Sequence, residues 1–395
     1  MRRFSYGLVA ALLLPWLLTD PGASASAAPA ATAAAESQEP FTVYLAPSDQ
    51  GGDDANGGLS TGDPINSISR AQEVLRENDP DTDVEIRIQQ GTYVAEPFHE
   101  WRYYIPGHTI SFMPIDYVPG EGMPPGGLPV FRNDQCGSHY CKGYWMMPSL
   151  PSDTNDPMYD GGTSGLEFYY LQLERYSAGG ISIYGDSERD VEDESYDPPL
   201  RVAGSKGLNG NKFFGMKFRQ LGNTHSGGGA EQFGYGGIVL TNSSDNEITN
   251  NHFVNIENDG SYAGAIHGVY VTHHSEHTRI TENKFSWISG DPVKVRNRSN
   301  FTTVEQNTFT RTGRLAYYKG EFCDPACAEA NDLAQQCASY HNRFFDNTVN
   351  SGYDGGRISD WALSPEGLTN AGGEPCSIPD GETRVRTGGN QPGSG

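Results

Sequence analysis

The residues of this sequence that could do acid–base chemistry gather in short segments with one alternating pattern. The segments span 237–241, 268–272, 292–296 and 315–319, and aliphatic residues alternate with other types in the first three. Because side chains on a strand alternate between its faces, the aliphatic residues are predicted to point inward. Aligned by hand, the outward residues form columns: Val239, Tyr270, Lys294, Tyr317; then Thr241, Thr272, Arg296, Lys319; then Gly236, His267, Asp291, Arg314.

One outward face therefore collects basic and aromatic residues in a chain that is acidic elsewhere. Neighbouring strands lie ~4.8 Å apart, so adjacent columns bring these side chains within reach of each other. The following turns add His273, His274 and Arg298. Such a patch suits β-elimination on a uronate polysaccharide, because a cation can neutralise the carboxylate while charge develops in an enolate-like transition state.

This chemistry assigns a role to each residue type. A base removes the C5 proton of the uronate and an acid protonates the leaving oxygen. Lys294 or His267 is the expected base, and Tyr270 is the expected acid. Arg296 or Arg298 is expected to clamp the carboxylate. The expected catalytic residues are Lys294, Arg296, Tyr270 and His267, and the expected substrate-binding residues are Arg298, His273, Tyr317, Lys319 and Arg314.

Two other interpretations of this face stay open. Glycoside hydrolysis needs two carboxylates at a defined separation. The face offers Asp291 and Glu321 but no stacked pair of aspartates, so hydrolysis ranks below elimination. The third interpretation is a carbohydrate-binding or adhesive solenoid without catalysis, in which Lys294 and Arg296 are ordinary solvated charges.

The elements that position this face come from a repeat centred on asparagine. In each copy an apolar residue precedes the Asn, and a large apolar residue follows two positions later. A short, β-rich repeat predicts a solenoid in which each coil buries its face by stacking on the next. Stacked asparagine side chains can bond to the coils above and below. The predicted ladder is Asn251, Asn283, Asn307 and Asn347.

Upstream of the repeats the pattern predicts a strand, a helix and a second strand. The strands are expected at 41–45 and 84–88. Asp63 and Pro64 have the residue types of an N-cap and a first helical position. Apolar residues at 65, 68, 71 and 75 share one helix face, and Pro80 ends the helix.

The segment Tyr44–Pro47, the turn Gly91–Tyr93 and the coils down to Asn350 resemble the pectate-lyase-like right-handed parallel β-helix superfamily. The resemblance covers most of the chain after residue 40. It implies an all-β fold, a single right-handed parallel β-helix whose open end is capped by the N-terminal helix. It also implies a secreted carbohydrate-active protein, with a polysaccharide lyase as the expected activity. The segment Asn297–Ser299 is similar to the Asn-Lys-Ser segment of alginate- and chondroitin-type lyases, with Arg298 in place of their basic lysine.

The N-terminal residues predict export. Two arginines precede an apolar run at 6–18, and small residues follow it, as in a secretory signal peptide. The expected organisation is a signal peptide at 1–27, an Ala-rich linker at 28–40, the β-helix at 41–361, and a disulfide-tethered, then flexible, tail at 362–395. The exported protein is expected to be extracellular, free of the membrane and monomeric.

Charge and cysteine content narrow the partners further. The formal net charge of −23 argues against nucleic acid, which needs a basic footprint, but a local basic groove can still hold an anionic polysaccharide. Six cysteines in an exported chain predict disulfides. Cys136 and Cys141 would close a small loop, and Cys337–Cys376 with Cys323–Cys327 is the preferred pairing, although other connectivities stay open.

The sequence indicates no cofactor with certainty, and calcium is possible. The acidic segment at 186–194 makes calcium the one candidate, since Ca²⁺ takes six to eight oxygen ligands. The spacing of its carboxylates matches no known calcium loop, and a solvated loop is the simpler interpretation.

Overall fold

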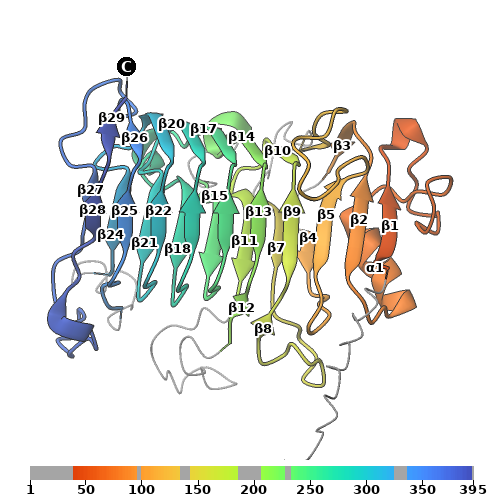
Figure 1. Cartoon of the computed structure of the whole chain (residues 1–395), viewed down its shortest axis with the longest axis horizontal. Helices are drawn as coiled ribbons and strands as arrows, with labels where there is room; N and C mark the ends of the chain where they lie inside the picture. The colour runs from red at the N-terminus through yellow and green to blue at the C-terminus, as the bar shows by residue number, and fades with distance from the viewer. Residues whose placement is uncertain are drawn as a thin grey trace, which may run out of the picture. The chain divides into compact units, whose positions relative to one another are not determined.

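Alternating apolar residues fold the chain into stacked coils, most of which give one strand to each of three parallel sheets (Figure 1). The structure, a computed structural model, describes residues 39–95, 99–133, 143–185, 206–226, 233–323 and 336–393. Strands from successive coils pair in parallel, as β14, β17, β20 and β23 do. This is the topology of a parallel β-helix, and it confirms the predicted all-β solenoid.

The strands of the described residues divide among the sheets as follows. Sheet A contains β1 (Phe41–Leu45), β2 (Val84–Ile88), β5 (Ile110–Pro114), β9 (Leu166–Tyr169), β13 (Lys212–Phe214), β16 (Glu247–Thr249), β19 (Arg279–Thr281), β22 (Thr303–Glu305), β25 (Arg343–Phe345) and β28 (Arg386–Gly388). Sheet B contains β3 (Thr92–Val94), β6 (Val130–Arg132), β10 (Gln172–Glu174), β14 (Lys217–Leu221), β17 (His252–Ile256), β20 (Lys284–Ile288), β23 (Thr308–Thr312), β26 (Thr348–Val349) and β29 (Gln391–Pro392). Sheet C contains β4 (His99–Trp101), β7 (Tyr144–Pro148), β11 (Gly179–Tyr184), β15 (Gly236–Thr241), β18 (His267–Thr272), β21 (Val293–Arg296), β24 (Tyr318–Glu321) and β27 (Ala362–Leu363). A small separate pair joins β8 (Gly162–Thr163) to β12 (Leu208–Asn209).

The asparagine ladder forms as predicted, at the bend between sheets A and B. The side-chain oxygen of Asn283 accepts hydrogen bonds from the backbone N–H and the side-chain amide of Asn251, at 2.8 and 3.0 Å. The Asn283 amide in turn donates to the side-chain oxygen of Asn307 at 3.0 Å. The ladder continues through Asn347 to Asn390, which the sequence pattern did not reveal.

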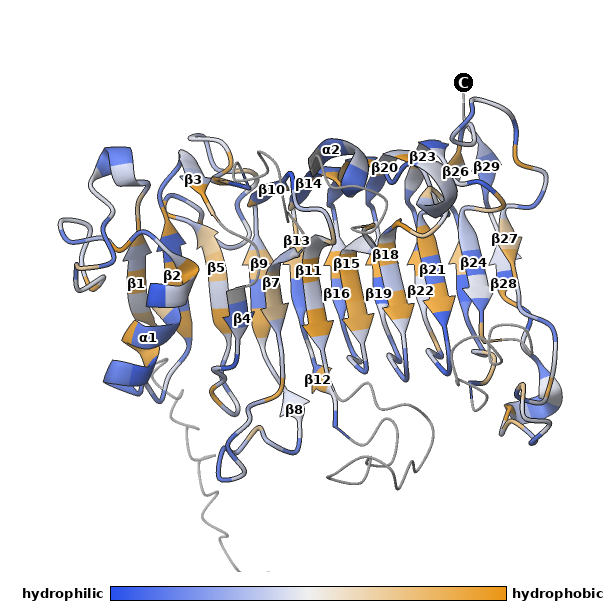
Figure 2. Cartoon of the chain, turned by 180° about the vertical axis from the view of Figure 1, so that it is seen from behind, coloured by the Kyte–Doolittle hydropathy of each residue, from blue (hydrophilic) through white to orange (hydrophobic). Residues whose placement is uncertain are grey.

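Inside the coils, aromatic rings stack in register with the backbone. Figure 2 shows hydrophobic bands alternating with polar residues along the strands. The close approach needs glycine on the facing strand, because a Cβ at Gly268 would lie 2.6 Å from the ring of Phe285. The central stack is Phe218, Phe253, Phe285 and Phe309, with neighbouring ring centroids 4.8 to 4.9 Å apart.

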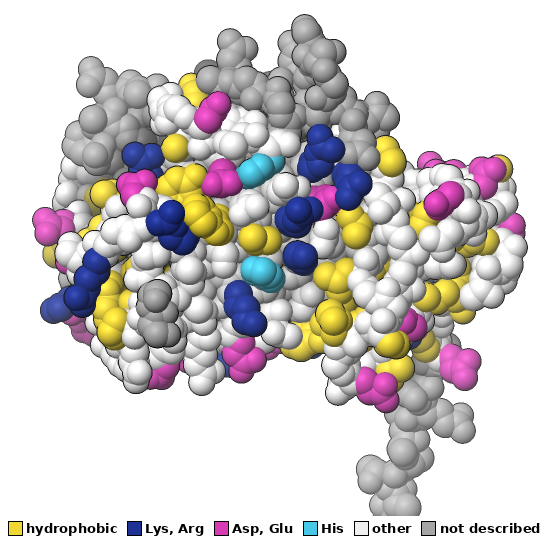
Figure 3. Space-filling model, turned by 90° about the horizontal axis from the view of Figure 1, so that it is seen from above, with side chains coloured by type: hydrophobic (Ala, Val, Ile, Leu, Met, Phe, Trp, Pro, Cys, Tyr) yellow, Lys and Arg dark blue, Asp and Glu magenta, His cyan; other side chains and the backbone are white. Residues whose placement is uncertain are grey.

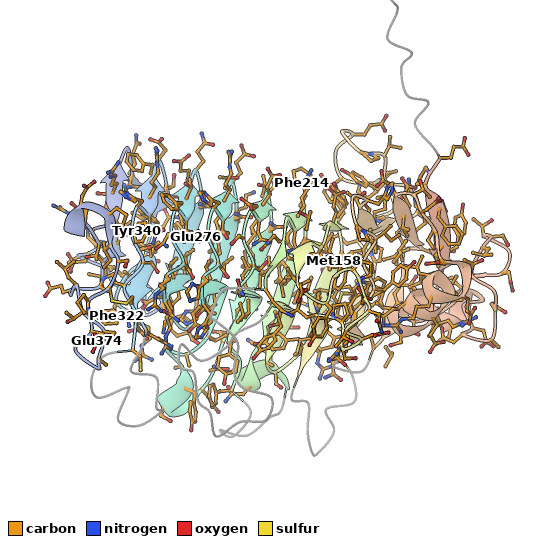
Figure 4. All side chains as sticks on the ribbon, turned by 90° about the horizontal axis from the view of Figure 1, so that it is seen from below. Met158, Phe214, Glu276, Phe322, Tyr340 and Glu374 are labelled. Atoms are coloured by element: carbon orange, nitrogen blue, oxygen red, sulfur yellow. A yellow bond between two sulfur atoms is a disulfide. The ribbon has the colours of Figure 1, made fainter. Side chains whose placement is uncertain are left out.

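The turns from sheet C to sheet A are tied together by side chains as well. Asn300 donates to the Glu276 carboxylate at 2.6 Å, and its side-chain oxygen accepts from the Tyr340 backbone N–H at 3.0 Å. Figure 4 labels Glu276 and Tyr340, and Tyr340 lies nearer the C-terminal end of the stack of coils. Polar turn residues therefore link successive coils here, as the asparagine ladder does at the bend between sheets A and B.

The N-terminal helix α1 (Ile68–Asn78) forms, but it begins later than predicted. Ser67 is the N-cap, and its hydroxyl accepts a hydrogen bond from the Arg70 backbone N–H at 3.1 Å. The predicted start at Asp63 and Pro64 is wrong because Ile65 forms a β-bridge with Leu45, which keeps this segment extended. The helix packs beside β1 and β4; its role as a cap on the solenoid stays a prediction.

The C-terminal residues extend the three sheets. The strands β27, β28 and β29 pair in parallel with β24, β25 and β26. The boundary predicted at residue 361 is therefore too early, and residues 386–392 are not a free tail. The Gly- and Pro-rich composition of this segment predicted a flexible tail. Its strands of two or three residues are too short to show an alternating pattern that would have indicated sheet.

The described residues test the cysteine predictions only in part. Cys337 and Cys376 form the preferred disulfide, with Cα atoms 5.8 Å apart. Cys323 is also disulfide-bonded. The other cysteines, Cys136, Cys141 and Cys327, lie outside the described residues, as do the signal peptide, most of the linker and the acidic segment at 186–194. No helix in the described part of the chain has the length and apolar character needed to cross a membrane.

Candidate functional site on the outer face of sheet C

Strand register brings most of the predicted reactive residues onto adjacent strands. On the outer face of sheet C, Tyr270 lies directly opposite Lys294, and Lys294 opposite Lys319. The next column places Thr272, Arg296 and Glu321 opposite one another. Their inward neighbours are the fully buried valines of β18 and β21, so alternation along the strands holds these polar side chains outward.

One carboxylate joins the two lysines of this face. The Glu321 oxygens lie 3.0 Å from the Lys294 Nζ and 2.8 Å from the Lys319 Nζ. Although burial alone would raise it, these two ammonium groups lower the pKa of Glu321 to about 2. Glu321 is therefore ionised at ordinary pH, and the cluster carries one net positive charge. The sequence-based alignment missed this pairing.

The two arginines are held by different neighbours. The Arg296 Nε donates to the side-chain oxygen of Gln336 at 2.8 Å, and that oxygen also accepts from the Cys323 backbone N–H. Arg298 donates to the Asn297 side-chain oxygen at 3.1 Å. Arg298 also lies 3.3 Å from the Sγ of Cys337, so it packs against the disulfide. Arg296 is the arginine that belongs to the strand face.

His267 lies below the cluster and is not exposed to a substrate. It is 2 % exposed, and its Nδ1 lies 2.6 Å from the carbonyl oxygen of Asp291. Burial, and then the Lys294 ammonium, lower the pKa of His267 to about 3. The imidazole is therefore neutral at ordinary pH and donates its Nδ1 hydrogen to that carbonyl. Its ring centroid is 5.3 Å from that of Tyr270, which it can position.

A hollow of about 370 Å³ adjoins the cluster on its N-terminal side. This size lies within the range of small-ligand sites. Tyr270 and His273 line it together with tyrosines that the sequence alignment did not select. Burial and the neighbouring Tyr270 raise the pKa of Tyr235, so its hydroxyl stays protonated. The lining residues are Tyr144, Met147, Ser182, Tyr184, Tyr235, Val239, Thr241, Tyr270, Thr272 and His273.

Tyr317 is not on this face, so its predicted substrate-binding role is wrong. It is 1 % exposed, and its ring packs on Phe309 with centroids 5.4 Å apart. Strand register places Lys319, not Tyr317, opposite Lys294. The sequence alignment of the segment 315–319 is therefore two residues too early. A slip of two residues preserves the inward–outward alternation, so the pattern alone could not expose it.

The turn that enters β24 accounts for the remaining predicted residues. Arg314 is exposed on this turn, beside the strand face. Asp291 is buried, and one of its oxygens accepts hydrogen bonds from the backbone N–H groups of residues 314 to 316, at 2.8 to 3.1 Å. Asp291 therefore fixes the turn, and it is not the second carboxylate of a hydrolase.

The described residues contain no group of three or more His, Cys, Asp or Glu side chains arranged to hold a metal ion. The acidic segment considered for calcium lies outside them.

Comparisons with known proteins give likenesses of fold. No family model and no curated protein sequence matches the chain. Several solved structures are similar to it, among them three lyases. A rhamnogalacturonan lyase shares 13% identity over 79% of this chain and 69% of its own, with a TM-score of 0.40. A pectate lyase shares 11% identity over 79% and 69%, with a TM-score of 0.43. An alginate lyase from a Paenibacillus species shares 13% identity over 82% and 93%, with a TM-score of 0.37. At these values the likenesses carry no argument about activity, and the β-helix fold rests on the parallel sheets themselves.

Proposed function

We propose that this protein is a secreted polysaccharide lyase that cleaves a uronate-containing glycan by β-elimination on the outer face of sheet C. The observation that carries the proposal is the register of three strands. It puts Tyr270, Lys294 and Lys319 in one outward column, with Arg296 in the next. The tyrosine-lined hollow beside the column offers rings on which sugars can stack.

The proposed reaction assigns one step to each group. Lys294 is the proposed base for the C5 proton of the uronate, and it must first release the ammonium proton that takes part in its ion pair with Glu321. The C–H electron pair becomes the C4=C5 double bond as the bond from C4 to the glycosidic oxygen breaks. Tyr270 donates its hydroxyl proton to that oxygen. Arg296 binds the carboxylate and offsets the charge that develops on it. His267 is too deeply buried to touch the substrate, so it positions Tyr270.

Two other functions have weaker support on this face. Hydrolysis would need a free pair of carboxylates, but Asp291 is bound by three backbone N–H groups and Glu321 by two lysines. Binding without cleavage is the second candidate. The same Glu321 contacts favour this function, because a lysine that is already paired with a carboxylate is less available as the base of an elimination.

A panel of glycans separates these functions. The exported protein is incubated with polygalacturonate, alginate, hyaluronan, chondroitin and a neutral galactan. The proposal expects at least one polyuronate to gain the ultraviolet absorbance of a C4=C5 double bond, in step with new reducing ends. New reducing ends without that absorbance would contradict the lyase and indicate a hydrolase. Binding without either product would indicate a carbohydrate-binding protein.

A further inference from the structure

The outer face of sheet B carries a basic stripe, which we define as Lys217, His252 and Lys284. They lie directly opposite one another on β14, β17 and β20. Figure 3 looks onto the molecule from above and shows Lys, Arg and His side chains over the middle of the view, with Asp and Glu side chains among them. The stripe belongs to a chain with a formal net charge of −23, and it lies on a different sheet from the candidate lyase site.

The lysines of the stripe form no close ion pairs with the described acidic residues. Within the described residues, neither Lys217 nor Lys284 has an ion-pair partner. Burial, and then the two lysines, lower the pKa of His252. The stripe therefore has a lysine on either side of an imidazole that stays neutral at ordinary pH. An anionic ligand that spans the stripe would pair with both lysines.

Flanking residues extend the positive character of the face. Glu174 is buried between Arg132 and Arg219, so these three residues together carry one net positive charge. On β20 of the same sheet, Trp287 is 41 % exposed, and the guanidinium of Arg311 on β23 lies 4.6 Å from its ring centroid. An exposed indole beside cations suits a sugar that bears a carboxylate.

We infer that the outer face of sheet B is a second binding site, which holds an anionic polysaccharide chain along the stack of coils. The spacing favours this class of polymer. The two lysines lie two strands apart, at ~9.6 Å along the stack, which suits a polymer whose charges recur with its sugars. A DNA duplex carries one charge per about 1.7 Å, so the acidic molecule would repel it more strongly.

The inference shares its ligand class with the proposed function, but it rests on a different face and concerns binding rather than cleavage. A site of this kind would hold a long polymer on the enzyme between cleavage events at sheet C. Short fragments that reach only sheet C would gain no affinity from this second site. The test must therefore measure binding of the polymer separately from cleavage.

Affinity electrophoresis measures the binding of the polysaccharide directly. The exported protein is run through gels that contain polygalacturonate, alginate or hyaluronan, at low and at high salt. Wild type is expected to be retarded by at least one of them, with less retardation at high salt. Lys217→Gln/Lys284→Gln should bind about tenfold more weakly, as for the loss of two surface charge contacts, one half-buried and one exposed. The matched control is Arg279→Gln/Arg386→Gln, which removes two exposed charges from sheet A and should bind as wild type.

The outcomes of the inference and of the lyase proposal can be told apart. Arg296→Ala on sheet C should lose cleavage but keep this binding, which would support a separate site. The inference is overturned if the sheet B double variant binds as wild type, if the sheet A control weakens equally, or if none of the three polymers is bound. Equal or tighter retention by duplex DNA would contradict the assigned ligand class.

Discussion

At the scale of residues, Glu321 sets the charge balance of the candidate site. It pairs with both lysines of the outward column and leaves the cluster with one net positive charge. A substrate carboxylate that approaches Lys294 must therefore compete with a carboxylate already present. Arg296 lies in the next outward column and donates to the side-chain oxygen of Gln336. Its planar guanidinium can bind a carboxylate with two parallel hydrogen bonds, which makes Arg296 the candidate for carboxylate recognition.

The pH dependence of stability tests the Glu321 pairing. Its pKa is lowered from 4.5 to about 2, so its contribution is present above about 4.5 and is lost as pH falls towards 2. Glu321→Gln should lower the free energy of unfolding at neutral pH by about 1 to 2 kcal/mol, after allowing for solvent screening of the partly exposed pair. Chemical denaturation of both proteins from pH 7 to pH 2 measures this. The two curves should converge at the acid end, and a constant offset would contradict the pairing.

The sequence predicted the outward face itself but not its details. Alternation placed Tyr270, Lys294 and Arg296 correctly on one face, because buried valines leave only one orientation for each strand. It failed at Tyr317, where a two-residue slip keeps the same alternation. It also predicted that His267 is a catalytic residue. Strand periodicity does not reveal that other residues bury its side chain.

At the scale of elements, the asparagine ladder joins the coils one to the next. Each asparagine both accepts from the coil before it and donates to the coil after it, and the Asn283 amide also donates to the Ile248 carbonyl at 2.8 Å. The sequence revealed the ladder because Asn, apolar flanks and spacing recur together. It missed Asn390, whose neighbours are glycine and glutamine.

Removing one member should weaken the whole stack. Asn283→Ala leaves the buried Asn251 N–H without its acceptor and removes a hydrogen bond from the Ile248 carbonyl, so we expect a loss of about 3 kcal/mol in the free energy of unfolding. Urea denaturation measures it. Gln391→Ala, at an exposed position of β29, is the control and should change stability by less than about 0.5 kcal/mol. A loss in Asn283→Ala no larger than in the control would show that the ladder is not a stabilising element.

At the scale of the whole molecule, the disulfide ties the last coils to the site. Cys337 bonds to Cys376, and the Cys337 backbone N–H donates to Asn297, next to Arg298. The bond closes a loop with a sequence separation of 39 residues. Replacing both cysteines by serine should lower the free energy of unfolding by about 2 to 4 kcal/mol, because the unfolded chain gains freedom. Thermal melting of the exported protein checks this, and an unchanged melting temperature would contradict it.

The arrangement of the molecule also explains why its C-terminal boundary escaped prediction. Residues 362–392 add β27, β28 and β29 to the three sheets, but each strand is only two or three residues long. Such strands gain their pairing from the preceding coil, and not from a pattern of their own. Register against a neighbouring strand is information that one sequence does not contain.

The central claim is that the outer face of sheet C is the reactive face, and Arg296→Ala tests it most directly. On whichever polyuronate wild type cleaves, this variant should lower kcat/KM by about 10²-fold or more, as for the loss of one charge-stabilising donor. Its melting temperature should stay close to that of wild type, since an outward charge contributes little to stability. Arg279→Ala, an exposed arginine on sheet A, should keep full activity. Full activity in Arg296→Ala, or an equal loss in Arg279→Ala, would contradict the assignment of the reactive face to sheet C.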